Sequence, residues 1–569
     1  MLYIIIEKSI AAYCEVYFAT QSARKLIQKS ISKVKETMSQ TIEYPQLVIK
    51  RYHQTGTTFA HCLVCSTVPK NAENKYREDL LLDHSCSLFS LSQLKETLKN
   101  FIESEWENSG QNILKKITII LDIHGYNVPL KNFEKNTYEL LKRKFQADTS
   151  GKKLDDFVIF INFSWPSESA FKSQWIGFFQ AMPIMLQFIL IGAVALIILF
   201  GATPLYSLGL ILAGLGLCLV ALRLVVYFRD RDRAANHGVF DAVELVRWLH
   251  VILQEILQEK THHSPEATEH LKSDPEFFGV VNLSFIAHSM GCFVTTQMIR
   301  ILSDIFDPSV IRRWKTTDGP FGGKDTKSPL TAEEAVELKK IGHFFILKSL
   351  ILASPDIPIW AITSSRSNFL QSCLRRFQEA YLFTNDADMV LRLASTVANY
   401  FVFPSASRIG GYRLGNLTLT RNRSYGMINV GDKDLGVRAF TRNINLTEKP
   451  FYSTSDVYQF FTVVDCTDYQ DKLVTNSDLQ GRRLSVLTAN NSITNLLNYI
   501  TTSICHLLGI GQIDSHGGYF RGKFCLDLIY LLALSGKAKL PPNLNMELKK
   551  YQIAWIETCN NQTTHVTKT

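Results

Sequence analysis

The sequence has no block in which basic residues gather with aromatic residues between them. Its formal net charge of +9 comes from 61 Lys and Arg against 52 Asp and Glu, and these residues are spread along the chain. A nucleic-acid-binding face needs clustered Lys and Arg with interleaved aromatic side chains. We therefore expect no nucleic-acid partner, and a modest attraction to anionic membrane surfaces is the better use of this charge.

The cysteines lack the regular spacing of a disulfide framework. The chain has 11 of them, and several lie inside apolar runs: Cys218, Cys292, Cys505 and Cys525. This distribution favours reduced, buried thiols. The first residues also lack the basic segment and long apolar run of a secretory signal, so we expect no cleaved signal peptide.

The His and Cys residues near the N-terminus do not have the spacing of a zinc site. His61, Cys62 and Cys65 form one group, and His84 with Cys86 forms another. The second pair departs from standard ligand spacing, and the residues between the two cysteines of the first group have the apolar character of a strand. We expect buried thiols here, and neither a metal nor a cofactor.

Charged residues are absent from Ser173 to Leu222. A membrane-spanning helix needs about 20 apolar residues, and Met182 to Gly201 supplies one such run and Tyr206 to Phe228 a second. Pro204 lies between the two runs and ends the first helix. The sequence therefore predicts a two-helix transmembrane hairpin over residues 182–228; the alternative is a buried helical hairpin in a soluble core.

Basic residues flank this hairpin on both sides. Lys172 precedes it, and four arginines follow: Arg223, Arg229, Arg231 and Arg233. Positively charged flanks favour the cytoplasmic side of a membrane. We expect an integral membrane protein that has the lipid bilayer as a partner and its globular part in the cytoplasm.

Short β-rich runs alternate with amphipathic stretches from about residue 110 onward. The expected strands are 117–123, 157–163, 280–286, 344–353, 379–383 and 460–465, and the expected helices are 130–145, 236–258, 290–306 and 389–400. Such alternation is typical of an α/β fold with a mostly parallel sheet and helices on both faces. In such folds the ligand site lies at the carboxyl ends of the strands.

These elements define an α/β domain over residues 110–540, which the hairpin at 182–228 interrupts. Residues 1–109 form an N-terminal region of uncertain fold, although Leu47 to Ser66 is strand-like, and residues 541–569 form a C-terminal tail. The hairpin falls between an expected strand and its crossover helix. It is therefore an insertion within one domain, not a boundary between two.

A serine follows one of the expected strands in the sequence Ala287-His288-Ser289-Met290-Gly291. A nucleophile elbow needs small residues two positions before and two positions after the serine, because larger side chains clash in the tight turn. Ala287 and Gly291 meet this requirement. The sequence predicts Ser289 as a nucleophile; the alternative is a serine in an ordinary strand-to-helix turn.

The backbone around this serine also suggests an oxyanion hole. In this fold one donor is the N–H that follows the nucleophile, which is Met290, and the second comes from the loop after an earlier strand. His124-Gly125-Tyr126-Asn127 occupies that loop, so we expect the Tyr126 N–H as the second donor. His124 is then expected to organise the loop and not to act as the base.

The base and the acid should follow the nucleophile in the chain, the acid before the histidine. His516 is the candidate base by elimination, because it lies in the polar loop Asp514-Ser-His-Gly-Gly-Tyr519 whereas His343, His506 and His565 do not fit. The candidate acids at strand ends are Asp356, Asp386 and Asp388. The strand at 379–383 favours the last two, and N-capping of the following helix is the alternative role for each.

Taken together, the motifs resemble those of a bacterial family of uncharacterised α/β hydrolases. They are His-Gly-Tyr-Asn, Ser-Trp-Pro-Ser, Ala-His-Ser-Met-Gly, Ser-Pro-Asp, Asn-Asp-Ala-Asp-x-x-Leu-Arg-Leu-Ala-Ser and Ser-His-Gly-Gly-Tyr, over about residues 110–535. The resemblance implies a Ser-His-Asp hydrolase. Alignment through Leu391-Arg392-Leu393 selects Asp388 as the acid, whereas alignment from Tyr381 forward selects Asp386. The transmembrane insertion and the first hundred residues depart from the family pattern.

The expected protein is a membrane-anchored serine hydrolase of the esterase, lipase or thioesterase type. Its triad would be Ser289, His516 and Asp388, with Asp386 as the alternative acid, and its substrate an acyl ester or acylated molecule at the bilayer. The second hypothesis is a catalytically silent hydrolase fold that serves as a membrane scaffold or interaction module. The sequence predicts no oligomeric state.

Overall fold

A ten-stranded mixed sheet organises the part of the chain that the computed structural model describes. The described residues fall, with short gaps, in the ranges 47–68, 91–109, 117–125, 157–167, 230–263, 281–303, 340–391, 413–416, 461–471 and 515–557, together with residue 214. The strands are β1 (Leu47–Thr55), β2 (Phe59–Ser66), β3 (Ile117–Ile123), β4 (Phe157–Ser164), β5 (Val281–His288), β6 (Lys340–Ile341), β7 (Phe345–Ala353), β8 (Glu379–Thr384), β9 (Thr462–Asp465) and β10 (Ala554–Ile556).

The strand order in the sheet is β1-β2-β4-β3-β5-β7-β8-β9-β10, with β6 paired to β7 off this path. From β2 to β9 along this order every strand runs parallel to its neighbours. The outer pairs β1–β2 and β9–β10 are antiparallel, as is β6–β7. The expected α/β class with a mostly parallel sheet is therefore confirmed, and each expected strand is present.

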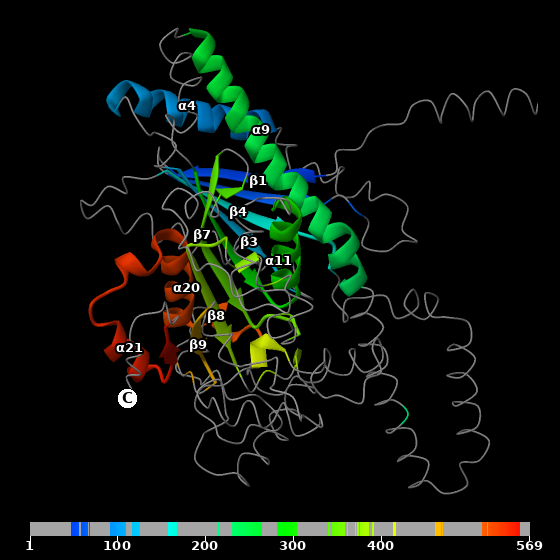
Figure 1. Ribbon diagram of the computed structural model, residues 1–569, viewed down its shortest axis with the longest axis vertical. Helices are drawn as coiled ribbons and strands as arrows, with labels where there is room; N and C mark the ends of the chain where they lie inside the picture. Colours follow the sequence, from blue (N-terminus) through cyan, green and yellow to red (C-terminus); the bar gives the residue numbers. More distant parts are fainter. Residues whose placement is uncertain are drawn as a thin grey trace, which may run out of the picture. The chain divides into compact units, whose positions relative to one another are not determined.

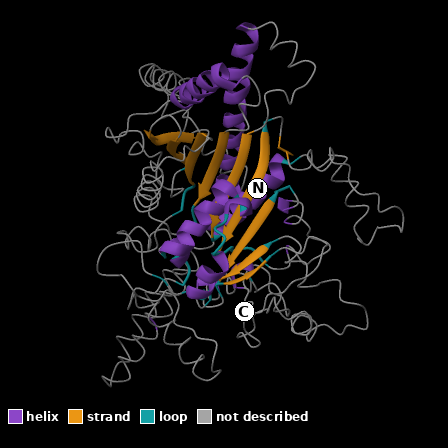
Figure 2. Cartoon of the chain, turned by 90° about the vertical axis from the view of Figure 1, so that its left-hand side faces the viewer, coloured by secondary structure: helices purple, strands orange, loops and turns teal. Residues whose placement is uncertain are grey.

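Helices cover both faces of the sheet, which explains why the central strands are buried along nearly their whole length and rich in apolar residues. On one face α4 (Leu91–Ser109), α9 (Val239–His263) and α11 (Met290–Leu302) pack against Ile119 and Leu121 of β3. On the other face α20 (Lys523–Ser535) and α21 (Leu544–Lys550) share a core with Ile120. Figure 1 shows α11 and α20 on opposite sides of the sheet, and Figure 2 shows the strands side by side, seen from the side where α20 lies.

The sheet extends beyond the limits that the sequence pattern suggested. Strands β1 and β2 lie within residues 1–109, yet β2 pairs with β4 and so belongs to the same sheet. Strand β10 lies within residues 541–569, where a tail was expected, and pairs with β9. The strand-like character expected for Leu47 to Ser66 is confirmed by β1 and β2. Strand β10 has only three residues and carries little periodic signal of its own.

His61 and Cys62 of β2 face opposite sides of the sheet, as alternation along a strand requires. Cys62 lies in the core beneath α4 and α9, whereas the ring of His61 stacks on Phe160 on the other face. Among the residues the structure describes, no group of His, Cys, Asp or Glu side chains could hold a metal ion. His84 and Cys86 lie outside the described ranges.

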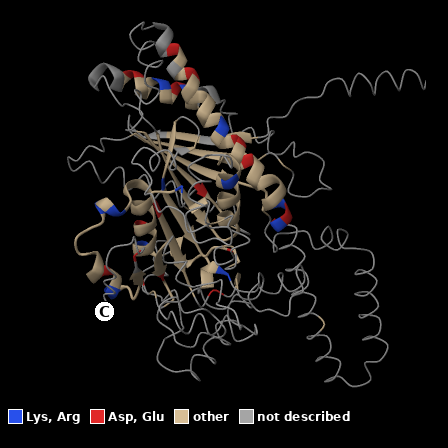
Figure 3. Ribbon diagram, viewed as in Figure 1, with Lys and Arg blue, Asp and Glu red and all other residues tan. Residues whose placement is uncertain are grey.

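Ion pairs connect α4 to α9 where the two helices meet. Lys95 contacts Glu255 and Glu259 at 2.8 and 2.9 Å, and Lys99 contacts Glu259 at 2.8 Å. Figure 3 shows acidic and basic residues on both helices. Because these side chains are partly exposed and water screens their charges, the pairs add little to the stability of the contact. Apolar packing of Leu94, Leu98 and other α4 residues holds the helix in place.

No helix in the described ranges combines the length and the apolarity needed to cross a bilayer. The predicted hairpin at 182–228 falls outside those ranges except for Gly214. The expected helices at 130–145 and 389–400 also lie largely outside them, whereas the expected helices at 236–258 and 290–306 correspond to α9 and α11.

Candidate active site

Ser289 occupies a strained turn between β5 and α11. Its backbone has φ of 53° and ψ of −120°, a conformation that L-residues adopt rarely and that costs of order 1–3 kcal/mol. Three backbone hydrogen bonds maintain it: the Ser289 N–H donates to Ala353 O at 2.9 Å, and Ser289 O accepts from Cys292 at 3.1 Å and from Asp356 at 3.2 Å. The end of β7 therefore fixes the turn, which has the strand-turn-helix form of a nucleophile elbow.

Two glycines allow this turn to lie against the end of β3. A Cβ atom on Gly291 would lie 2.4 Å from Ile123 O and 2.6 Å from His124 O, and one on Gly125 would lie 2.7 Å from Ser289 Cβ. Neither position can take a larger residue without a shift of backbone. The small residue that the elbow pattern required at position 291 thus has a steric cause, and Gly125 is a second requirement that the pattern did not include.

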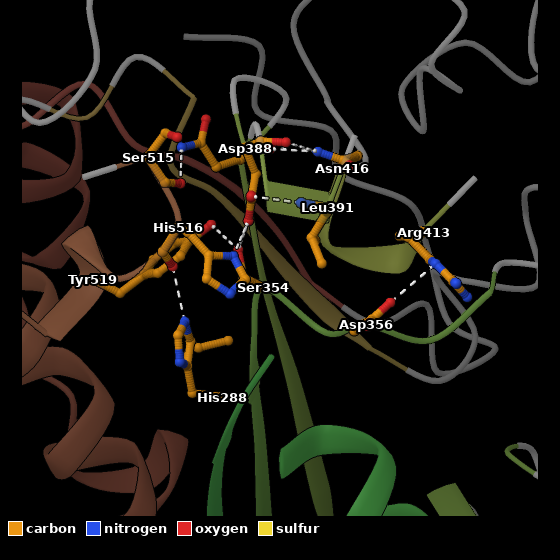
Figure 4. A network of polar contacts seen from close by, with 12 residues as sticks. His288, Ser354, Asp356, Asp388, Leu391, Arg413, Asn416, Ser515, His516 and Tyr519 are labelled. Atoms are coloured by element: carbon orange, nitrogen blue, oxygen red, sulfur yellow. Dashed lines mark hydrogen bonds and ion pairs between the residues drawn. The ribbon is translucent and has the colours of Figure 1, made fainter. Parts of the chain in front are cut away.

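His516 and Asp388 form the hydrogen-bonded pair that a catalytic triad requires. His516 Nδ1 lies 2.7 Å from Asp388 Oδ2, and both side chains are buried (Figure 4). Because a carboxylate oxygen accepts, Nδ1 donates its proton and Nε2 carries the lone pair. This is the tautomer in which a histidine can act as a general base.

A second histidine connects the loop of this base to the elbow. His288 Nε2 donates to the backbone O of His516 at 2.9 Å, and the two rings lie 4.7 Å apart between centroids. His288 directly precedes Ser289, so the loop that carries the base is bonded to the residue beside the nucleophile (Figure 4). From the other side, Asn385 Nδ2 donates to Ser515 O at 2.7 Å.

The two roles considered for the acid are both present at Asp388, one on each carboxylate oxygen. Oδ2 accepts from His516, and Oδ1 accepts the backbone N–H of Leu391 at 3.1 Å, as a helix cap does. Asn416 Nδ2 also donates to the Asp388 backbone O at 3.2 Å. The side chain is fully buried, so these contacts define a single orientation for it.

The other candidate acids are placed differently. Asp356 pairs with Arg413 through Oδ1 and Nε at 3.0 Å, and both side chains are almost completely buried. Its carboxylate thus neutralises a buried guanidinium. Asp386 lies outside the residues that the structure describes.

The structure describes one of the two predicted oxyanion-hole donors. Met290 is the first residue of α11 and lies next to Ser289. The N–H groups of a helix's first turn have no partner within the helix and point along its positive end. Tyr126, the predicted second donor, is outside the described residues.

His124 makes contacts that organise its loop, in keeping with its expected role. Its Nδ1 lies 2.7 Å from Gly125 O and its Nε2 lies 3.2 Å from Ser164 Oγ. Its ring stacks on Trp165 at 5.4 Å, and the Trp165 indole N–H donates to His124 O at 2.8 Å. The ends of β3 and β4 are thereby joined beside the elbow.

A short segment that matches no sequence motif contacts the loop that carries Asp388. Residues 413–416 lie between the ends of β7 and β8: Gly415 N–H donates to Pro355 O at 3.2 Å, and Gly415 O accepts from Asn385 N–H at 2.9 Å. Arg413 and Asn416 add the side-chain contacts described above. Arg-Leu-Gly-Asn has no periodicity, so only the paired charges of Arg413 and Asp356 could have suggested the contact.

Comparisons of the chain with protein-family models, with curated proteins and with solved structures find no match in any of the three. The function of the site is therefore inferred from its own geometry.

Proposed function

We propose that the protein is a serine hydrolase of the α/β-hydrolase fold, with Ser289 as nucleophile, His516 as base and Asp388 as acid. The observation that carries this proposal is the 2.7 Å bond from His516 to Asp388, in a loop that is itself bonded to the residue beside a strained Ser289. The chain order of nucleophile, acid and histidine is that of the α/β hydrolases.

The proposed reaction is acyl transfer through a covalent intermediate. His516 Nε2 accepts the Ser289 proton as Oγ attacks an acyl carbonyl, and Asp388 stabilises the imidazolium that forms. The N–H groups of Met290 and Tyr126 bind the oxyanion. His516 then gives its proton to the departing alcohol or thiol, and water releases the acyl group from Ser289 by the same steps. This chemistry suits an esterase, lipase or thioesterase.

We further propose that residues 182–228 cross a bilayer as a two-helix hairpin and that the hydrolase domain lies on the cytoplasmic side. The described ends of this insertion support an even number of spans. Trp165, just after β4, packs against Gly238 just before α9, where an added Cβ would lie 3.2 Å from Trp165 Cβ. The segments before and after the insertion therefore pack together in one domain, whereas an odd number of spans would separate them across the membrane.

The same ends point to a membrane-resident acyl substrate. Trp165 stacks on His124, whose neighbour Gly125 packs against Ser289. In this proposal the insertion starts from the edge of the sheet that carries the nucleophile. A bilayer reached from this edge would lie close to the active site, which favours lipids or acylated membrane proteins as substrates over molecules free in solution.

An ester-hydrolysis assay on the full chain tests the proposal. We expect the protein in detergent to hydrolyse p-nitrophenyl esters, and Ser289→Ala to lower kcat by about 10³-fold or more. Ser303→Ala is the matched control: it removes a buried hydroxyl at the other end of α11, where Oγ donates to Ile299 O at 2.6 Å. Equal turnover by wild type and Ser289→Ala would contradict the proposal, and absence of turnover by wild type on ester and thioester series would favour a catalytically silent scaffold.

A further inference from the structure

A chain of hydroxyl groups lies behind the proposed acid. Ser354 Oγ donates to Asp388 Oδ2 at 2.5 Å, and the Tyr519 hydroxyl lies 3.0 Å from Ser354 Oγ (Figure 4). All three side chains are buried. Ser354 therefore contacts the same carboxylate oxygen that receives the His516 hydrogen bond.

The chemistry of the three groups fixes the direction of this chain. A carboxylate only accepts hydrogen bonds, so the Ser354 hydroxyl donates to Asp388. Ser354 Oγ in turn accepts a hydrogen bond from Tyr519. Tyr519 must then stay protonated. Burial raises the pKa of Tyr519 well above its usual value, and nearby Cys466, Asp388 and Cys525 add to the effect. The order of donation is thus Tyr519 to Ser354 to Asp388.

The backbone holds Ser354 in a conformation that serine rarely adopts. Its φ is 45°, and its N–H donates to Phe383 O at 3.0 Å. Gly415 packs so closely that an added Cβ would lie 2.7 Å from the Ser354 carbonyl carbon. Such strain persists where the surrounding structure over-determines a residue, and it is concentrated at functional sites. Two strand ends and the 413–416 segment therefore aim this hydroxyl at the acid.

We propose that Ser354, held by Tyr519, is a positioning residue that orients Asp388 and limits how strongly its Oδ2 attracts the proton on His516. The inference rests on the proposed function. Ser354 and His516 both donate to Asp388 Oδ2, so each hydrogen bond weakens the other. Without the Ser354 hydroxyl, the negative charge on Asp388 Oδ2 interacts with His516 alone, and the imidazolium becomes more stable.

The groups that face His516 and Asp388 determine which other titrations can affect the pH profile of the site. His288 faces the His516 ring from the end of β5, and Asp388 faces it from the loop after β8. Tyr519 lies in the loop of His516 itself and faces Asp388 through Ser354. His288 donates to a backbone carbonyl that Ser354 does not contact, so a change at Ser354 should act through Asp388.

The test is the rate of labelling of the full chain by a fluorophosphonate probe, measured from pH 5 to 9. For Ser354→Ala we expect a plateau rate about tenfold lower, because Asp388 loses the hydrogen bond that holds its orientation toward His516. We also expect the midpoint of the acidic limb to move up by about half a pH unit or more, because the base holds its proton more strongly. Tyr519→Phe should also lower the plateau rate and raise the midpoint, by smaller amounts.

Ser349→Ala is the matched control, since Ser349 is a fully buried serine on β7, five positions before Ser354. Its hydroxyl makes no hydrogen bond within the described ranges, and its removal should leave rate and midpoint unchanged. A Ser354→Ala profile like that of Ser349→Ala overturns the inference, as does a lower rate with an unmoved midpoint.

Two further outcomes separate this inference from the proposed function. If Ser354→Ala does not fold, the midpoint of Tyr519→Phe decides: an upward shift supports the inference and an unchanged one overturns it. If Ser289→Ala is labelled as fast as wild type, the proposed function itself is wrong, whatever the profiles show.

Discussion

His516 Nδ1 and Asp388 Oδ2 lie 2.7 Å apart although 128 positions separate the two residues in the chain. The loop after β8 carries the acid, and the loop before α20 carries the base. A hydrogen bond from Asn385 to Ser515 O joins the two loops a second time. The geometry therefore depends on the loops as a unit and not on one flexible side chain.

The first prediction separates the two carboxylates that the sequence left as alternatives. Asp388→Asn presents an amide to His516 Nδ1 and favours the wrong tautomer, so we expect kcat for ester hydrolysis to fall by about 10⁴-fold while the fold is retained. Asp386→Asn should retain full activity. The reverse pattern, with Asp386→Asn inactive and Asp388→Asn active, would assign the acid to Asp386 instead.

The second prediction concerns the closest approach at the elbow. Gly291→Ala introduces a Cβ that meets two backbone carbonyl oxygens at 2.4 and 2.6 Å, so we expect loss of probe labelling and a lower unfolding midpoint. Gly238→Ala is the control, because its nearest contact is a side-chain atom at 3.2 Å. Normal labelling of Gly291→Ala would show that the elbow is not as tight as described.

The third prediction tests the buried ion pair of Asp356 and Arg413. Arg413→Met leaves a buried carboxylate without its counter-charge, and we expect it to destabilise the protein by about 3–5 kcal/mol. Asp356→Leu combined with Arg413→Met removes both charges and should recover most of this loss. Thermal unfolding of the two variants measures the difference; equal destabilisation by the single and double substitutions would contradict it.

The fourth prediction uses a buried polar row on the α20 face of the sheet. Asn162 Nδ2 donates to Asp122 Oδ2 at 3.2 Å, and His61 Nε2 lies 2.5 Å from Asn162 Oδ1. Burial raises the pKa of Asp122 to about 8 and lowers the pKa of His61 to about 4. The unfolded chain loses the Asp122 proton near pH 4 and the His61 proton near pH 6.5.

Between about pH 4 and 6.5 the two residues therefore act in opposite directions: rising pH lowers the stability through Asp122 and raises it through His61. Between about pH 6.5 and 8 only Asp122 contributes, and stability falls. Asp122→Asn removes this fall, so it should gain roughly 1–2 kcal/mol over wild type across that interval. Denaturant unfolding at pH 6.5 and pH 8 measures it, and a constant difference between the two proteins would contradict the prediction.

The fifth prediction concerns the membrane hairpin. Because Trp165 packs against Gly238, a short Gly-Ser linker in place of residues 173–222 should preserve the domain. We expect this variant to move from the membrane to the soluble fraction, to keep its activity on soluble short-chain esters and to lose activity on vesicle-embedded substrates. Full-length protein that alkaline carbonate extracts from membranes would argue against the hairpin.

Local patterns predicted the strands of the sheet and named the triad candidates, because both steps follow from short-range rules. The strand at 117–123 and the strand before Ser289 are short runs dominated by apolar residues, and alternation with helices gave their parallel arrangement. Polar residues after such strands had to gather at one edge. That rule made Ser289 the candidate nucleophile and left three candidate acids, Asp356, Asp386 and Asp388. Elimination then selected His516, and the family resemblance favoured Asp388.

The supporting contacts could not be predicted in the same way. Ser354 and Tyr519 lie 165 positions apart, and His288 reaches a backbone carbonyl that has no sequence signature. Ser354 stood in the Ser-Pro-Asp motif, but the aspartate drew the prediction because carboxylates are the expected acids. The positive φ of Ser354 depends on packing by Gly415, which no local pattern specifies.

The central claim is that Ser289 is the nucleophile, and the most direct measurement is the site of covalent modification. Full-length protein treated with a fluorophosphonate probe should carry one adduct, which peptide mass spectrometry should locate on Ser289. We predict no adduct on Ser289→Ala and labelling slower by about 10³-fold or more for His516→Gln. An adduct on another residue, or one that persists unchanged in Ser289→Ala, would contradict the account.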